Sequence, residues 1–234
     1  MITDICRFFQ SPLDADIPAC YDADRTYRCL EEETGKMADI LLNLLIFTVT
    51  AFLLLRTARK DGEWMPDRVR MAFRFFTVQS NALCAAAALA AAAASLAGEM
   101  PEWIRIIKYI GTSAVTVTML TVFLFLAPSA GKDWVQVLLK GPDLFMHLLT
   151  PLAALISFGV FEKKGMTFGQ SLWGMLPVVL YGPLYLYKIR FAPKEKGWDD
   201  FYGFNRTGRW PVSFAAMLAG TFLICLGLMA WQNA

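Results

Sequence analysis

Charged residues are scarce in this chain, and histidine is almost absent. Asp, Glu, Lys and Arg make up 18% of the 234 residues, whereas soluble domains carry about a quarter. The single histidine, His147, excludes a haem held by two axial histidines. The five cysteines form no CxxC, so nothing supports a thiol-redox enzyme or a zinc site. With a net charge of +2 and no basic patch, we expect neither a nucleic-acid partner nor an acidic substrate.

Apolar residues are abundant instead, at 56% of the chain, with a mean hydropathy of +0.45. A helix needs about 20 mostly apolar residues to cross the hydrocarbon core of a bilayer. The sequence therefore predicts an all-α, polytopic membrane bundle in residues 37–234, preceded by an extramembrane segment in residues 1–36. Its six transmembrane helices are expected near 37–56, 75–97, 104–127, 143–161, 170–188 and 212–231.

Prolines interrupt the fourth and fifth of these runs, at Pro151, Pro177 and Pro183. Membrane helices tolerate proline where neighbouring groups satisfy the freed backbone carbonyl, so both runs are kept as spans. Residues Ala85–Ala94 of the second run are almost all alanine. Small side chains let helix backbones approach closely, so this stretch predicts tight packing of the second helix against its neighbours.

Basic residues indicate the orientation. The connections after the first, third and fifth spans hold 14 of the 22 Lys and Arg, and the tail after the sixth span holds none. Cytoplasmic connections carry such an excess, which predicts extracytoplasmic termini. Four basic residues on the N-terminal side oppose this trend: Arg7, Arg25, Arg28 and Lys36.

The N-terminal segment has acidic residues early and no sustained apolar stretch, so it does not read as a secretory signal. If the segment lies outside, one disulfide among Cys6, Cys20 and Cys29 is expected, with the pairing open. Cys84 and Cys225 fall within predicted spans, where ordinary helix packing explains them.

Polar residues gather where the second and fourth spans begin. Thr77, Ser80, Asn81 and Cys84 follow i, i+3, i+4, i+7 spacing and so share one helix face. Asp143 precedes His147 by four residues, so its carboxylate can orient the imidazole. Thr77 and His147 each lie about a turn inside their spans, counted from connections on the same side of the bundle, at a depth of roughly 5–8 Å.

Helix five ends on the same side with Tyr181, Tyr185, Tyr187 and Lys188, followed by an aromatic and acidic segment at 198–205. The opposite end of the bundle offers no comparable gathering. Packing explanations exist for each of these residues. A membrane threonine often bonds back to a carbonyl one turn earlier, Ser80 and Asn81 suit interhelical hydrogen bonds, and Tyr185 suits an interfacial belt.

Three short segments carry a resemblance to a known family. Phe75-Phe76-Thr77-Val78-Gln79-Ser80-Asn81-Ala82-Leu83 resembles the FFT-x-x-S-N-x-L entry of a bacterial family of six-helix membrane proteins. Met146-His147-Leu148-Leu149-Thr150-Pro151-Leu152 and Tyr181-Gly182-Pro183-Leu184-Tyr185 resemble segments of its fourth and fifth helices. That family is similar to the androgen-induced and androgen-dependent TFPI-regulating proteins of animals, which are membrane hydrolases of fatty acid esters of hydroxy fatty acids.

The resemblance implies a protein of the bacterial inner membrane that hydrolyses a fatty-acyl ester. Thr77 matches the family's threonine nucleophile and His147 its histidine. Ser80, Asn81, Asp143 and Tyr185 are expected to support them, without any cofactor or metal. The bilayer and a lipid ester are the expected partners. The alternative is a non-enzymatic membrane protein that binds or transports lipids, with Thr77 and His147 as packing groups.

Overall fold

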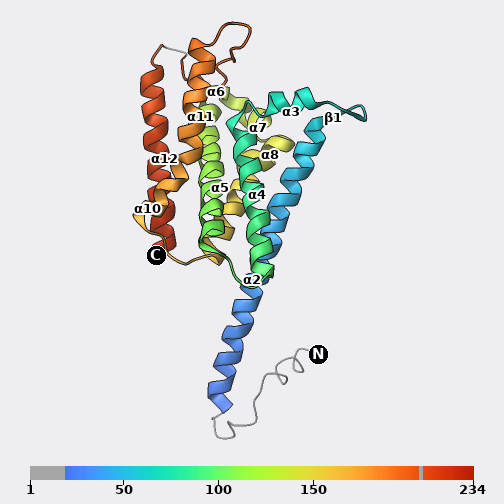
Figure 1. Cartoon of the computed structure of the whole chain (residues 1–234), viewed down its shortest axis with the longest axis vertical. Coiled ribbons are helices and arrows are strands. Elements are labelled where there is room, and N and C mark those ends of the chain that lie inside the picture. The colour runs from blue at the N-terminus through green and yellow to red at the C-terminus, as the bar shows by residue number, and fades with distance from the viewer. Residues whose placement is uncertain (1–18, 206–207) are drawn as a thin grey trace. The chain divides into compact units, whose positions relative to one another are not determined.

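The computed structural model describes residues 19–205 and 208–234, and these are mostly helical (Figure 1). The first half contains α2 (Ala19–Ala58), β1 (Arg59–Lys60), β2 (Glu63–Trp64), α3 (Pro66–Ala72), α4 (Phe76–Leu96), α5 (Glu102–Thr121), η1 (Val122–Leu126), α6 (Ala127–Ala130), η2 (Gly131–Asp133) and α7 (Trp134–Leu138). The second half contains α8 (Pro142–Leu144), η3 (Phe145–Leu149), α9 (Thr150–Ile156), η4 (Ser157–Phe161), α10 (Phe168–Ser171), η5 (Leu172–Met175), α11 (Leu176–Leu186), η6 (Tyr187–Phe191) and α12 (Trp210–Asn233).

The chain divides into two units, one up to Ala38 and one from Asp39 to Ala234. In the first unit, the described residues belong to the start of α2. The predicted disulfide cannot be compared with the structure, because Cys6 and the side chains of Cys20 and Cys29 lie outside the described residues. The extramembrane character of residues 1–36 therefore stays a prediction.

Five helical segments in the described part of the chain are long and apolar enough to cross a membrane. They are Glu32–Ala58, Phe76–Leu96, Glu102–Leu126, Pro142–Phe161 and Trp210–Asn233. Their outer faces expose large apolar side chains, among them Leu45, Phe52, Leu124 and Leu223. Water disfavours so much apolar surface on several helices, whereas lipid tails accommodate it. These features identify a helical protein suited to a membrane and agree with five of the six predicted spans.

The predicted fifth span, 170–188, is helical but irregular. It consists of α10, the 3₁₀ turn η5, α11 with only 11 residues, and the π-turn η6. Pro177 lies at the start of α11 and Pro183 inside it. A proline removes one intrahelical hydrogen bond, and neighbouring 3₁₀ or π geometry accommodates that loss. α11 packs against α5 and α12, but its role as a sixth span stays a prediction.

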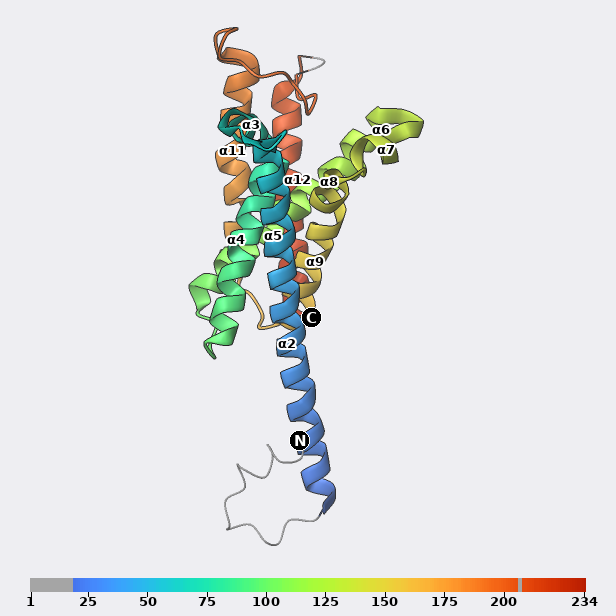
Figure 2. The same ribbon diagram turned by 90° about the vertical axis from the view of Figure 1, so that its right-hand side faces the viewer.

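The central helix of the bundle is α5, in which residues 111–118 are all buried. It packs most closely on α4, and Figures 1 and 2 show the two helices adjacent. A Cβ added to Gly111 would lie 2.9 Å from the Cα of Cys84, so this crossing requires glycine. Ala87, Ala88 and Ala91 of α4 are buried, which confirms the close packing predicted from the alanine stretch. Cys84 and Cys225 are buried free thiols, as expected of packing residues.

The helices from Asp39 onward alternate in direction, so two ends of the bundle can be named (Figure 1). The upper end contains the start of α4, the turn η3 and segment 198–205. The lower end contains the start of α5, segment 162–167 and the end of α12. A turn marks each end. At the upper end, the β1–β2 hairpin turns through Asp61 and Gly62, which both have positive φ. At the lower end, Gly98, with a φ of 107°, follows the end of α4.

Candidate functional site

Asn81 joins two of the predicted site segments at the upper end. This side chain is fully buried, and its Nδ2 donates to the Thr77 carbonyl at 2.8 Å and to the Met146 carbonyl at 3.0 Å. One amide thus holds the turn of α4 that carries Thr77 against the residue before His147. Helices α4 and η3 are therefore neighbours at this level, as they must be if Thr77 and His147 are to meet.

His147 lies half-buried in η3, a π-turn, and interacts with other parts of the protein. Such turns occur often at functional sites. Asp143 is exposed at the start of α8. In a π-turn, hydrogen bonds join residues five apart instead of four. The spacing of four between Asp143 and His147 therefore aligns their side chains less well than a regular α-helix would.

Ser80 forms an interhelical contact. Its Oγ lies 2.8 Å from Oγ1 of Thr118 in α5 and donates to the Thr77 carbonyl at 3.0 Å. Both donor positions of Asn81 are likewise occupied, by the Thr77 and Met146 carbonyls. Neither side chain has a free donor for a substrate, so both are suited to positioning α4.

Tyr185 organises segment 198–205. The side chain is buried, its phenol donates to Oδ1 of Asp200 at 2.9 Å, and it accepts the Tyr202 amide at 3.0 Å. Asp200 in turn accepts the amides of Phe204 and Asn205. Since all of these partners lie in segment 198–205, Tyr185 fastens that segment to α11.

Tyr202 brings the same segment to Thr77. Its phenol oxygen accepts the Phe76 amide at 2.9 Å and so caps the start of α4. Burial raises the pKa of the Tyr202 phenol, whereas hydrogen bonds from the Phe76 amide and the Thr77 hydroxyl lower it. The sequence placed Tyr202 in an aromatic segment on the correct side, but nothing in the segment distinguished it from the other aromatic residues.

The lower end holds a buried charged cluster, so the expectation of no comparable polar gathering there was wrong. Lys108 of α5 donates to the Ser157 hydroxyl at 2.6 Å and to Oε1 of Glu162, and its Nζ lies 3.5 Å from Oδ1 of Asp39. Ser157 donates to the same oxygen of Asp39 at 2.5 Å. We call Asp39, Lys108, Ser157 and Glu162 the Lys108 cluster. Its three ionisable side chains are each at most 7% exposed.

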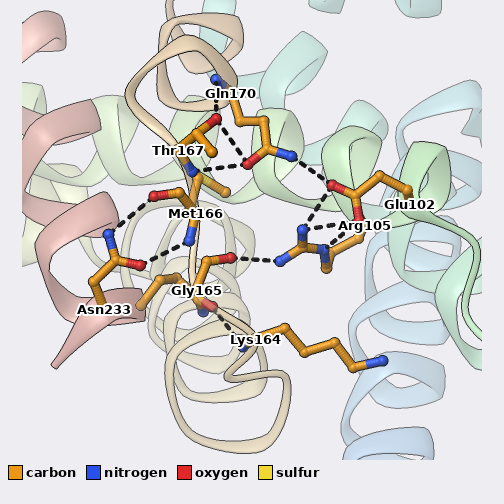
Figure 3. A network of polar contacts seen from close by, with 9 residues as sticks. Glu102, Arg105, Lys164, Gly165, Met166, Thr167, Gln170 and Asn233 are labelled. Atoms are coloured by element: carbon orange, nitrogen blue, oxygen red, sulfur yellow. Dashed lines mark hydrogen bonds and ion pairs between the residues drawn. The ribbon is translucent and has the colours of Figure 1, made fainter.

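A second polar network adjoins this cluster in sequence and is drawn in Figure 3. Arg105 donates to the Gly165 carbonyl at 2.7 Å and pairs with Glu102, which also accepts from Gln170 at 2.6 Å. Asn233 of α12 bonds both the amide and the carbonyl of Met166. The segment that follows Glu162 is therefore tied to α5 and α12.

The sequence contained a signal for the Lys108 cluster. Asp39 and Lys108 lie inside two of the predicted spans, and Glu162 directly follows a third. Ionisable residues in such places are costly and usually paired with one another. No spacing along the chain, however, reveals that these three meet. The described residues include no group of three or more His, Cys, Asp or Glu able to hold a metal ion.

Comparisons of the chain with protein-family models, with curated proteins and with solved structures give no match.

Proposed function

We propose that this protein is an intramembrane hydrolase that cleaves a fatty-acyl ester, with Thr77 as nucleophile and His147 as base. The observation that supports this proposal most is the Asn81 amide, which joins the Thr77 carbonyl to the Met146 carbonyl. A nucleophile and its base must come within hydrogen-bond reach of each other, roughly 3 Å. A buried amide bonded to both segments is a rigid way to hold them together.

In the proposed reaction, the Thr77 hydroxyl attacks the ester carbonyl carbon while His147 takes its proton. The tetrahedral intermediate collapses, and the leaving alcohol receives the proton from His147. This leaves the acyl group esterified to Thr77. His147 then takes a proton from water, which attacks the acyl carbon, and the fatty acid departs as Thr77 regains a proton.

The oxyanion of the intermediate needs a hydrogen-bond donor. The donor groups of Asn81 and Ser80 already form hydrogen bonds within the protein. We assign this role to the Tyr202 phenol, which meets the Thr77 hydroxyl and lies at the start of α4, where it accepts the Phe76 amide. Asp143 then serves as an outer group that orients His147, and Tyr185 as the anchor of segment 198–205.

The substrate enters from the bilayer in this proposal, and the termini lie outside the cytoplasm. The excess of Lys and Arg in the connections after the first, third and fifth predicted spans supports a cytoplasmic upper end. A reporter enzyme that works only in the cytoplasm, fused after Ala234, should stay inactive. Activity of that fusion would reverse the orientation while leaving the helices unchanged.

A fluorophosphonate probe for hydroxyl nucleophiles tests the enzyme directly. The full chain in lipid nanodiscs should be labelled at Thr77, and Thr77→Ala should lose the label. Thr221→Ala is a matched control, because Thr221 is a buried threonine whose hydroxyl merely donates to the Met217 carbonyl at 2.8 Å. Equal labelling of Thr77→Ala and the unchanged protein would leave Thr77 as a packing residue.

A non-enzymatic lipid carrier or transporter is the second candidate, and the Lys108 cluster favours it. Buried ionisable groups in membrane proteins often mark the path of an ion or a substrate. Reconstituted protein that moves a fluorescent fatty-acyl lipid between vesicle leaflets, with Thr77→Ala as active as the unchanged chain, would support this candidate over the hydrolase.

A further inference from the structure

The Lys108 cluster carries more negative than positive charge when all of its groups are ionised. Asp39 and Glu162 are carboxylates, and both contact the single ammonium of Lys108. Nearby charges do not offset the difference. Arg105, one turn earlier on α5, is paired with Glu102 and the Gly165 carbonyl, while Lys163 and Lys164 are exposed. From α12, the neutral Gln232 donates to the Phe158 carbonyl at 2.5 Å.

An uncompensated negative charge is costly at a site that is buried from water. Two carboxylates that share one site also repel each other, which favours a proton on one of them. The cluster is therefore most stable when one of its two carboxyl groups is protonated.

Glu162 has the oxygen to hold that proton. Its Oε1 accepts from Lys108, while its buried Oε2 has no hydrogen-bond partner among the described residues. A buried acceptor without a donor loses its hydration without compensation. A protonated Oε2 would instead be a donor, and the Asp39 carboxylate, which lies against the same Lys108 ammonium as Glu162, is a candidate acceptor.

The surroundings of Glu162 also favour its protonated form. Burial raises the pKa of the Glu162 carboxyl to about 7, the Lys108 ammonium opposes the rise, and Asp39 adds to it through its charge and a hydrogen bond. An exposed glutamate ionises near pH 4.5. At the lower end of the bundle, Glu162 therefore changes charge close to neutral pH.

We propose that Asp39 and Glu162 form a proton-binding pair that takes up and releases one proton between α2, α5 and η4. The proton sits on Oε2 of Glu162 and is shared with Asp39, while Lys108 and Ser157 hold the other oxygens. Its release leaves a net negative charge buried among three helical segments and weakens their packing. The pair is independent of the proposed hydrolase, because none of its residues belongs to the upper end.

Infrared spectroscopy of the full chain in lipid nanodiscs tests the pair, since a protonated carboxyl has a C=O stretch distinct from that of a carboxylate. Between about pH 5 and about pH 9 we expect one carboxyl band to disappear with a midpoint near 7. Glu162→Gln should remove the band. Glu99→Gln, at an exposed glutamate in the connection between α4 and α5, should leave it intact.

The second variant, Asp39→Asn, separates a shared proton from simple burial. With Asp39 neutral, Glu162 and Lys108 form a balanced ion pair. The midpoint of the Glu162 band should therefore move to lower pH by roughly one unit or more. A midpoint that does not move, a band that survives Glu162→Gln, or no titration at all in this range would each overturn the pair.

Thermal unfolding in detergent supplies a measurement that needs no spectral assignment. Since the folded protein binds the proton more tightly than the unfolded chain does, the stabilisation is complete below about pH 4.5 and is lost as the pH rises through 7. The melting temperature of the unchanged chain should therefore fall across this window. Glu162→Gln should flatten this dependence and Glu99→Gln should preserve it; an unchanged slope in Glu162→Gln contradicts the proposal.

Discussion

The upper and lower ends of the bundle satisfy their polar groups in different ways. Around Thr77 at the upper end, neutral phenol and amide groups bond to backbone atoms, as in Asn81 to the Met146 carbonyl and Tyr202 to the Phe76 amide. At the lower end, Lys108 is surrounded by two carboxylates and a hydroxyl. Neutral contacts can be exchanged for a substrate at modest cost, whereas buried charges must remain paired. The upper end is therefore suited to chemistry and the lower end to holding helices, and a proton, in place.

The first prediction concerns activity at the upper end and carries the largest effect. Thr77→Ala and His147→Ala should each reduce ester hydrolysis by about 10⁴-fold or more, and the double variant should be no worse than either single one. Groups that act as one unit fail together, so the effects should not add. The measurement is turnover of a fatty-acyl ester by purified protein, with Thr221→Ala as the control. Additive losses would show that the two residues act separately.

The second prediction concerns stability at the lower end. Lys108→Met removes the cation shared by Asp39 and Glu162 and should cost about 3–5 kcal/mol of folding free energy. Lys163→Met, at an exposed lysine next to Glu162, should change stability little. Denaturant or thermal unfolding in detergent measures both. Equal stability of the two variants would mean that the charges of the Lys108 cluster are not coupled.

The third prediction separates the two roles of Tyr202. Tyr202→Phe removes the acceptor of the Phe76 amide, which should cost about 1 kcal/mol of stability. If the phenol also stabilises the oxyanion, hydrolysis should fall by about 10²-fold with little change in KM. Tyr187→Phe, at an exposed tyrosine of η6, should leave both unaffected. A loss of stability without a loss of activity would reduce Tyr202 to a helix cap.

The fourth prediction tests the framework that both ends share. Gly111→Ala places a Cβ 2.9 Å from the Cα of Cys84 and should cost about 1–3 kcal/mol, because two helix backbones must move apart. Gly227→Ala in α12 meets no atom within 4 Å and should be neutral or slightly stabilising. Melting temperatures of the two variants, measured in the same detergent, decide the matter. A harmless Gly111→Ala would mean that the crossing of α4 and α5 is loose.

Much of the fold could be predicted from the sequence, because membrane spans depend on local composition. Apolar runs of sufficient length located five segments that the structure shows as helices long enough to cross a membrane. The alanine-rich stretch of α4 also predicted its close packing. The geometry of the predicted fifth span did not follow from its composition, because prolines permit several helical geometries. Only the structure shows 3₁₀, α and π segments between Phe168 and Phe191.

Much less of the candidate sites could be predicted from the sequence. Composition and the alternation of spans placed Thr77, His147 and segment 198–205 on one side, since depth within a helix follows from the rise per residue. Only the tertiary structure showed that Asn81 bridges to Met146, that Tyr202 caps α4, and that Asp39, Lys108 and Glu162 meet. Which helices are neighbours, and how each is rotated, results from side-chain packing across the whole bundle. Apolar periodicity along one helix records neither its partner nor the charge that its partner provides.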